Sequence, residues 1–378
     1  MVNTTKSSMM KKVLRLFIAF AFICICSIAV SVISAEATVT ITPSGDKSGK
    51  EDYRNIVAAL EEDGNIVLKK GGVYYIKATL YVSSNQSIKA TGATVISASG
   101  AVRNAPTAVN YNSINNFTLD GGTWKNKSSE GYKTSMIQFS HGKNITIKNA
   151  TIECNYQGHA VEIIACKNVT VENCKLLGIG KVVNNSVEEQ LQIDIATPKT
   201  APTVAEYGSK FVKGQTCKNI TIKNNTIRGS RGICANYAST EPKYINKFHK
   251  NIKIIGNKVN SKTAESIALF NTIGATVKNN KLTNKSSRTD TAYSVGLHIT
   301  MLANAPASIK KATYTVSGNT IKGGRQGLFV YSHSSSKFGK VIAKNNKCYA
   351  KAGASSALVI HKDSSIKAST SKNKTYKW

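Results

Sequence analysis

Two carboxylates draw attention because acidic side chains are scarce in this sequence, which has 20 of them against 51 lysines and arginines. Glu162 and Asp194 each occupy a polar position within a short apolar segment, residues 160–163 and 191–195. If both segments are strands, alternation turns each carboxylate away from the apolar side. Strands paired side by side would place the two groups about 5 Å apart, if Asp194 rather than Gln192 aligns with Glu162; the sequence leaves both alignments open. Such a pair suits a Ca²⁺ site or the acid and nucleophile of a retaining glycosidase. The alternative is two solvated carboxylates on a polar strand face.

Other ionisable groups lie close to this pair in the predicted pattern. Glu188 and Glu189 precede the Asp194 segment and can add oxygen ligands to a cation. Arg231 opens a later strand and can bind a substrate carboxylate through its planar guanidinium. His298 points outward by the same alternation and can act as an acid, a base or a sugar contact. For the last two, ordinary surface positions are the alternative. The predicted catalytic residues are Arg231, Asp194, Glu162 and His298, and the predicted metal ligands are Glu162, Asp194 and Glu189.

Further outward positions form a predicted substrate-binding surface on the same strands. Amides there can bind sugar hydroxyls, and flat aromatic rings can stack on sugar faces. Residues 196–215 directly follow Asp194 and form the longest excursion between repeats, so we expect this loop to overhang the surface. His159 is expected to stabilise a turn. The predicted substrate-binding residues are Gln192, Asn236, Phe270, Phe329, Tyr331 and Arg325.

The elements that must position these residues are predicted from an internal repeat. Phrases such as Asn-Ile-Thr-Ile-Lys-Asn begin at residues 116, 144, 168, 219 and 251, and weaker copies begin at 274, 313 and 340. Each phrase alternates apolar and polar residues and ends at Asn or Gly, as expected for a short strand followed by a tight turn. Strands this short must stack in parallel to share one core. The sequence therefore predicts a right-handed parallel β-helix.

Two further features support this architecture. An asparagine recurs after the turns and predicts an internal ladder of Asn225, Asn257, Asn280, Asn319 and Asn346. Residues 51–63 have apolar side chains on one helical face and predict a helix that caps the open end of the core. We expect a signal peptide at 1–37, an amino-terminal cap at 38–100 and the β-helix at 101–378.

Residues 49–96 resemble the amino-terminal cap of pectate-lyase-superfamily proteins, with a helix containing Ala-Leu, then Gly-Gly-Val-Tyr-Tyr-Ile and Gly-Ala-Thr-Val-Ile. The coils that follow resemble the pectin-lyase-like β-helix. The resemblance implies polysaccharide chemistry, and in the lyases a basic residue removes a proton while Ca²⁺ acidifies it, roles that Arg231 and the Glu162–Asp194 pair would take. The polygalacturonase motifs and the Trp-Ile-Asp-His signature are absent, so no activity transfers residue by residue.

The charge and the amino terminus predict where the protein works. Basic residues from Lys6 to Arg15 precede an apolar run at 16–33, with small residues at Ala35 and Ala37 suited to cleavage. An uncleaved anchor is the alternative. The formal charge of +31 attracts polyanions, although lysines that only keep a strand-rich surface soluble are an equal alternative. Export disfavours nucleic acid as the partner.

We therefore predict a secreted monomer, free of the membrane after cleavage, that acts on or binds an acidic polysaccharide or an anionic cell-wall polymer. The leading hypothesis is a Ca²⁺-dependent lyase that cleaves uronate polymers by β-elimination. The alternatives are a polygalacturonase-type hydrolase that uses Glu162 and Asp194, and a non-catalytic surface adhesin held to glycans by charge.

Overall fold

The structure, a computed structural model, describes residues 38–302, 311–332, 338–361 and 366–378. The predicted signal peptide, residues 1–37, lies outside the described residues. No helix within the described ranges is long and apolar enough to cross a membrane.

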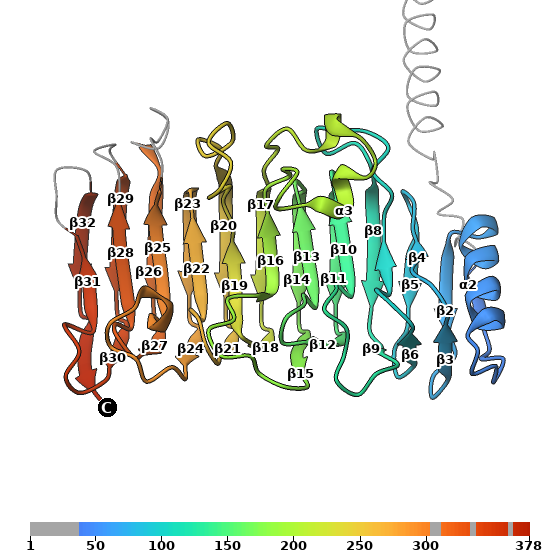
Figure 1. The fold of residues 1–378 in the computed structure, drawn as a ribbon, viewed down its shortest axis with the longest axis horizontal. Coiled ribbons are helices and arrows are strands. Elements are labelled where there is room, and N and C mark those ends of the chain that lie inside the picture. The colour runs from blue at the N-terminus through green and yellow to red at the C-terminus, as the bar shows by residue number, and fades with distance from the viewer. Residues whose placement is uncertain (1–37, 303–310, 333–337, 362–365) are drawn as a thin grey trace, which may run out of the picture. The chain divides into compact units, whose positions relative to one another are not determined.

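Short strands from Val39 onward stack into three parallel sheets, which confirms the predicted parallel β-helix (Figure 1). The chain visits sheet A, sheet B and sheet C in turn and then begins the next coil. Sheet A consists of β1 (Val39–Ile41), β2 (Asn65–Leu68), β5 (Ser87–Lys89), β8 (Asn115–Asp120), β11 (Lys143–Lys148), β14 (Lys167–Glu172), β17 (Lys218–Lys223), β20 (His249–Ile255), β23 (Thr272–Lys278), β26 (Thr313–Ser317), β29 (Gly339–Lys344) and β32 (Ile366–Ser371).

Sheet B consists of β3 (Val73–Ile76), β6 (Thr94–Ser97), β9 (Thr123–Asn126), β12 (Thr151–Asn155), β15 (Lys175–Ile179), β18 (Thr226–Gly229), β21 (Lys258–Ser261), β24 (Lys281–Asn284), β27 (Thr320–Gly323), β30 (Lys347–Ala350) and β33 (Lys374–Lys377). Sheet C consists of β4 (Leu80–Tyr81), β7 (Val102–Arg103), β10 (Ile137–Ser140), β13 (Val161–Ile164), β16 (Glu189–Asp194), β19 (Arg231–Ala235), β22 (Ile267–Phe270), β25 (Leu297–Met301), β28 (Leu328–Ser332) and β31 (Leu358–Ile360).

The core lies between the sheets and repeats from coil to coil. Ile147, Val171, Ile222 and Ile254 occupy equivalent positions of successive sheet A strands, and all are fully buried. Each such side chain contributes about 1.5–3 kcal/mol by leaving water. Because the same position is apolar in these successive coils, the period-two pattern fixes which of their residues face outward.

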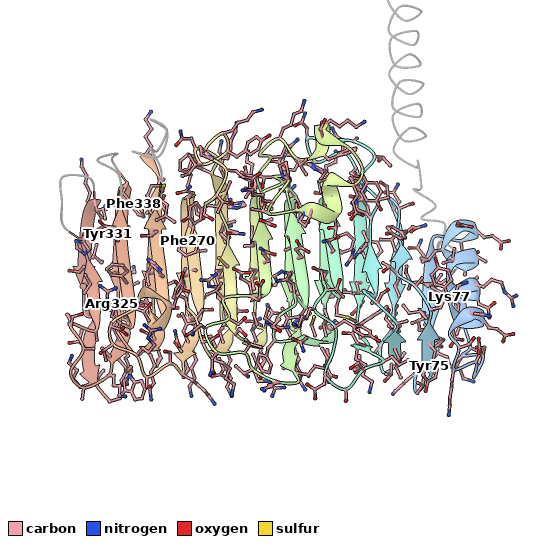
Figure 2. The ribbon with its side chains drawn as sticks, viewed as in Figure 1. Tyr75, Lys77, Phe270, Arg325, Tyr331 and Phe338 are labelled. Carbon is pink, nitrogen blue, oxygen red and sulfur yellow. The ribbon has the colours of Figure 1, made fainter. Side chains whose placement is uncertain are left out.

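The helix α2 (Lys50–Glu62) lies at the amino-terminal end of the sheets, beside β2 and β3 (Figure 1). Its Ile56 and Leu60 are buried in the same core. The buried Asp52 carboxylate accepts hydrogen bonds from the backbone N–H groups of Ser44 and Tyr75, at 2.7 and 2.8 Å. Tyr75 and Lys77 are labelled near this helix in Figure 2. The strands of residues 38–100 belong to the same three sheets as the rest of the coil.

The turns between sheets A and B need left-handed backbone angles, as the recurring Asn and Gly predict. Asn224 has φ 57°, Gly256 has φ 69° and Asn279 has φ 56°. Asparagine and glycine adopt this region with the least steric cost.

The predicted asparagine ladder is confirmed immediately after these turns. Each side-chain amide donates to the next asparagine carbonyl oxygen at 2.9–3.0 Å, and the same oxygen accepts the buried backbone N–H of the preceding asparagine. The ladder consists of Asn225, Asn257, Asn280, Asn319 and Asn346, and it continues to Asn373. A second, more exposed stack, which the sequence analysis missed, links Asn116, Asn144, Asn168, Asn219 and Asn251 at the start of sheet A.

Candidate functional site

A groove of about 810 Å³ crosses the outer face of sheet C. Its floor consists of outward side chains from β10 through β25. One wall follows the carboxyl ends of the strands and includes the short helix α3 (Pro202–Ala205), part of the 196–215 loop. The opposite wall lies at the amino ends of the strands and includes Lys133, residues 157–159 and the 3₁₀ turn η2 (Ala292–Ser294). The overhang predicted for the 196–215 loop is therefore present.

The strand register corrects the predicted carboxylate pair. Glu162 lies opposite Gln192, while Asp194 lies opposite Ile164. The two carboxylates share the outer face but stand diagonally, in different columns. The column of Glu162 continues through Gln192 and Cys234 to His298. Of the two alignments that the sequence left open, the register therefore has Gln192 beside Glu162, and the expected pairing of the two carboxylates is wrong. A shift of two residues keeps the face and changes the neighbour.

Two side chains of the preceding coil hold the Glu162 carboxylate by hydrogen bonds. The carboxylate accepts hydrogen bonds from the Ser135 hydroxyl and, at 2.5 Å, from the Gln138 amide. Gln138 also donates to the Thr203 hydroxyl of α3 at 3.1 Å, which ties the overhanging loop to the floor. Glu162 is 6% exposed and lines the groove.

Asp194 is fully buried and does not line the groove. One carboxyl oxygen lies 3.5 Å from the Asn236 amide, and the other has no partner. Burial, with the charges of Glu162 and Glu189 adding to it, raises the pKa of Asp194 well above its ordinary value of 3.8. A metal ligand or a nucleophile must be ionised and accessible, whereas burial disfavours the ionised form of Asp194 and keeps it out of the groove, so these predicted roles of Asp194 are not supported.

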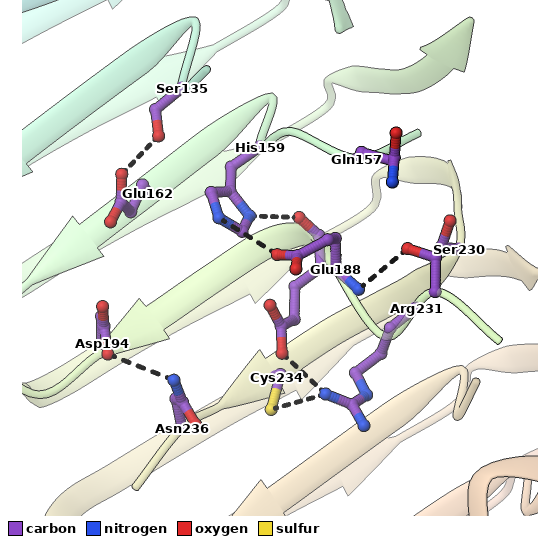
Figure 3. Close-up of polar contacts among 12 residues, drawn as sticks. Ser135, Gln157, His159, Glu162, Glu188, Asp194, Ser230, Arg231, Cys234 and Asn236 are labelled. Carbon is purple, nitrogen blue, oxygen red and sulfur yellow. Dashed lines mark hydrogen bonds and ion pairs between the residues drawn. The ribbon is translucent and has the colours of Figure 1, made fainter. Parts of the chain in front are cut away.

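Arg231 is the centre of a buried ion network (Figure 3). Its guanidinium contacts Glu189 at 2.7 Å and Glu265 at 2.9 Å. The second oxygen of Glu265 lies 3.0 Å from the Nδ1 of His298. Burial alone lowers the pKa of Arg231, but Glu265 and Glu189 outweigh it and raise that pKa well above its ordinary range. A guanidinium held this way is a fixed cation, so the predicted role of Arg231 as a proton acceptor is disfavoured.

A second titratable cluster stands at the groove wall (Figure 3). The Nδ1 of His159 lies 2.6 Å from the backbone oxygen of Glu189, and its Nε2 lies 4.0 Å from the Glu188 carboxylate. Burial raises the pKa of Glu188, and the charge of Glu189 adds to the shift. The Glu188 side chain is 47% exposed, which makes it the accessible acid of this cluster.

The predicted substrate-binding residues divide between two places. Gln192, Asn236 and Phe270 line the groove, as does the predicted catalytic His298. The remaining three, Phe329, Tyr331 and Arg325, lie beyond its carboxyl-terminal end, where Phe329 stacks on Tyr331 with ring centroids 5.9 Å apart. Figure 2 labels Phe270, Tyr331 and Arg325 among the coils of the carboxyl-terminal half of the chain.

The predicted Ca²⁺ ligands do not form a suitable donor set. Ca²⁺ requires six to eight oxygen ligands. Glu162 is already engaged by Ser135 and Gln138, Asp194 is enclosed, and Glu189 holds the Arg231 cation. His159, Glu188 and Glu189 bring ligand atoms within 4.8 Å of one another, but the same guanidinium adjoins them. Calcium binding thus stays a prediction without a fitting site at these residues.

Sequence reasoning missed Glu265 as a member of the site. Alternation cannot place Glu265, because it lies in the turn before β22 rather than on the strand. The sequence signal that could have found Glu265 is the scarcity of acidic residues in this lysine-rich part of the chain. Glu188 and His159 were noted as a cation ligand and a turn residue, and neither pattern predicted that they meet.

No protein-family model matches the sequence. The chain is 33% identical over 93 residues to plasmin and fibronectin-binding protein A of Streptococcus pneumoniae; the match covers 22% of this chain and spans only 12% of that protein. The crystal structure of PfbA, a surface adhesin of Streptococcus pneumoniae, matches with a TM-score of 0.58 at 15% identity, covering 90% of each chain. An endo-xylogalacturonan hydrolase from Aspergillus tubingensis has a TM-score of 0.47 at 13% identity, covering 90% of this chain and 93% of that one. The chain thus has the right-handed parallel β-helix fold.

Proposed function

We propose that this protein is a secreted or cell-surface β-helix that holds an extended, uronate-containing polysaccharide in the groove over sheet C. The observation that carries the proposal is the groove itself, an open channel of about 810 Å³ that crosses several coils. A channel across successive coils suits a linear polymer better than a compact ligand. The surface adhesin PfbA, which shares the fold, supports a role in attachment.

The charges in the groove are arranged by depth, and this arrangement favours an acidic sugar chain. Glu162, Glu189 and Glu265 lie at the floor and are buried. The exposed cations Lys133 and Lys199 stand on opposite walls. Sugar hydroxyls can reach the floor while carboxylates on the ring reach the lysines at the rim.

Removing the two rim lysines tests this proposal. The double variant Lys133→Gln, Lys199→Gln should weaken retention on immobilised polygalacturonate about fivefold at low salt, since two exposed ion pairs together contribute about 1 kcal/mol. The matched control is Lys175→Gln, Lys258→Gln, which removes the same charge from exposed positions on sheet B. Equal retention of a neutral glucan would exclude an acidic ligand, and retention of no glycan would exclude the binding proposal.

Hydrolysis is a second candidate, favoured by the raised pKa of the accessible Glu188, which lines the same groove as Glu162. In this hypothesis Glu188 donates a proton to the leaving oxygen and Glu162 serves as the second carboxylate, in place of Asp194. The activity should then fall as the pH rises through the Glu188 pKa, because the acid must be protonated.

New reducing ends from polygalacturonate or alginate, formed without a product that absorbs in the ultraviolet and lost in both Glu162→Gln and Glu188→Gln, would establish hydrolysis. A product that absorbs in the ultraviolet and disappears with chelator would instead establish the Ca²⁺-dependent lyase. Binding without either product identifies the protein as an adhesin.

A further inference from the structure

Four lysines stand in register along sheet A, away from the groove. In the strand register, Lys143 lies opposite Lys167, Lys167 opposite Lys218, and Lys218 opposite Lys250. These residues belong to the neighbouring strands β11, β14, β17 and β20 (Figure 1). Neighbouring strands are about 4.8 Å apart. We call these four residues the lysine row. All four are at least partly exposed.

No acidic side chain neutralises the lysine row among the described residues, whereas other lysines of the same sheet form ion pairs with carboxylates. At the other end of the same strands, Lys148 forms an ion pair with Asp120 at 3.3 Å and Lys223 with Glu172 at 2.6 Å. Among the residues that the structure describes, no carboxylate forms an ion pair with the lysine row. Like charges directly opposite on paired strands are destabilising. The row therefore carries a repulsion that an anionic partner would relieve.

The row is also distinct from the lysines of sheet B, which are as exposed but interrupted. There Lys258 pairs with Lys281, and the flanking positions of the same column are Thr226 and Thr320. On sheet B, the lysine-rich composition thus gives only a run of two lysines on neighbouring strands at this position. The unbroken row of four is particular to sheet A.

A pocket of about 320 Å³ lies beside the row, at the turns that lead into β14, β17 and β20. Lys213 and Lys247 line it, and its lining contains no acidic residue. Tyr111 closes one side and donates its hydroxyl to the backbone oxygen of Thr216 at 3.0 Å. The pocket extends the cationic surface into a concave one.

The neighbours of the row favour a sugar polymer over nucleic acid. Next to it stand the exposed asparagine stack and a column of threonines on β11, β14 and β17: Thr146, Thr170 and Thr221. Amides and hydroxyls can bind sugar hydroxyls. Single-stranded nucleic acid is usually held by aromatic rings on which bases stack, and these two columns contain none.

We propose that the lysine row and its adjoining pocket form a second polymer-binding site, which takes a linear polyuronate with one carboxylate on each sugar. A pyranose linked at opposite ring positions advances its chain by about one strand spacing, so successive carboxylates meet successive lysines. The site lies on a different sheet from the groove and does not depend on the function proposed there.

The test is the affinity of the protein for polygalacturonate, measured at low and at physiological salt. The variant Lys143→Gln, Lys167→Gln, Lys218→Gln, Lys250→Gln should bind about tenfold more weakly at low salt, with a shallower salt dependence. The matched control Lys175→Gln, Lys258→Gln, Lys281→Gln, Lys347→Gln removes the same charge from sheet B and should change the affinity less than about twofold. The groove variant Lys133→Gln, Lys199→Gln is measured beside them.

Each result decides between the two sites. Weakening by the row variant supports the lysine row whether or not the groove variant binds normally. Weakening by the groove variant alone overturns the lysine row and leaves the groove proposal intact. Equal weakening by the row and sheet B variants shows an effect of net charge only and overturns the row. A single-stranded oligonucleotide that binds the row as tightly as polygalacturonate overturns its assignment to polysaccharide.

Discussion

Asp194 and Arg231 are both buried at sheet C, yet burial affects their charges in opposite ways. Asp194 has no cationic partner and an unsatisfied oxygen, so the neutral form is favoured. Arg231 lies between Glu189 and Glu265, so the charged form is favoured despite desolvation. The identity of the contacting partner, rather than the depth of burial, therefore decides which ionisable residues of this site keep their charge.

The variant Asp194→Asn should stabilise the protein increasingly as the pH rises above 4. The pKa of Asp194 in the folded protein is raised above the ordinary 3.8 of the unfolded chain. The stability that Asp194 contributes to folding is therefore fully present below pH 3.8 and is lost as the pH rises through the folded pKa. Within that window the loss is about 1.4 kcal/mol for each pH unit. Thermal unfolding of both proteins at pH 4 and pH 8 checks this, and a difference that is the same at both pH values would contradict it.

The variant Arg231→Met should lower the free energy of unfolding by about 3–5 kcal/mol, because it leaves Glu189 and Glu265 as buried charges without a partner. Urea unfolding followed by circular dichroism measures the change. The control is Arg288→Met, which breaks the exposed pair with Asp290 and should leave stability unchanged. Similar losses in the two variants would show that the buried network is not special.

At the level of elements, the turns after sheet A join the coils through side chains as well as through the strands. The internal asparagines satisfy buried backbone N–H groups that lack a strand partner. The exposed stack joins the coils at the other end of the strand through bonds between side chains, from residues at positive φ such as Asn168 at 55°. Hydrogen-bonded stacks at both ends fix the register of the coils, which is why outward columns such as the lysine row can be unbroken.

The variant Asn257→Ala should destabilise the protein by about 3 kcal/mol. It removes bonds to Asn280 and to the Ile222 carbonyl, and it leaves the buried N–H of Asn225 without an acceptor. Chemical unfolding gives the value. Asn168→Gly serves as the control in the exposed stack, since glycine keeps the positive φ and water replaces the lost side-chain bonds. A larger loss for Asn168→Gly would contradict the structural role of the internal ladder.

Across the whole coil, cohesion comes from repeated packing and not from covalent cross-links. All six cysteines of the described residues are buried and unpaired. Burial raises the pKa of Cys166 to about 12 and that of Cys174 to about 11, so these thiols are also unreactive.

The cysteines should therefore react with a thiol reagent only after unfolding. Titration of the folded and the denatured protein should differ by the six buried thiols per chain, and added reductant should leave the melting temperature unchanged. A melting temperature that falls with reductant would reveal a disulfide and contradict this expectation.

The coil, the turn residues, the internal ladder and the outward direction of Glu162, Gln192 and His298 could all be predicted from local patterns, because a period of two and a tolerance for positive φ are local properties of the chain. Which residues meet could not be predicted in this way and depended on the folded coil. The register set Gln192 rather than Asp194 beside Glu162, Asp194 became fully buried, and Glu265 reached Arg231 from a turn. The charge of a buried group depends on partners that lie far away in the chain, and no local pattern contains that information.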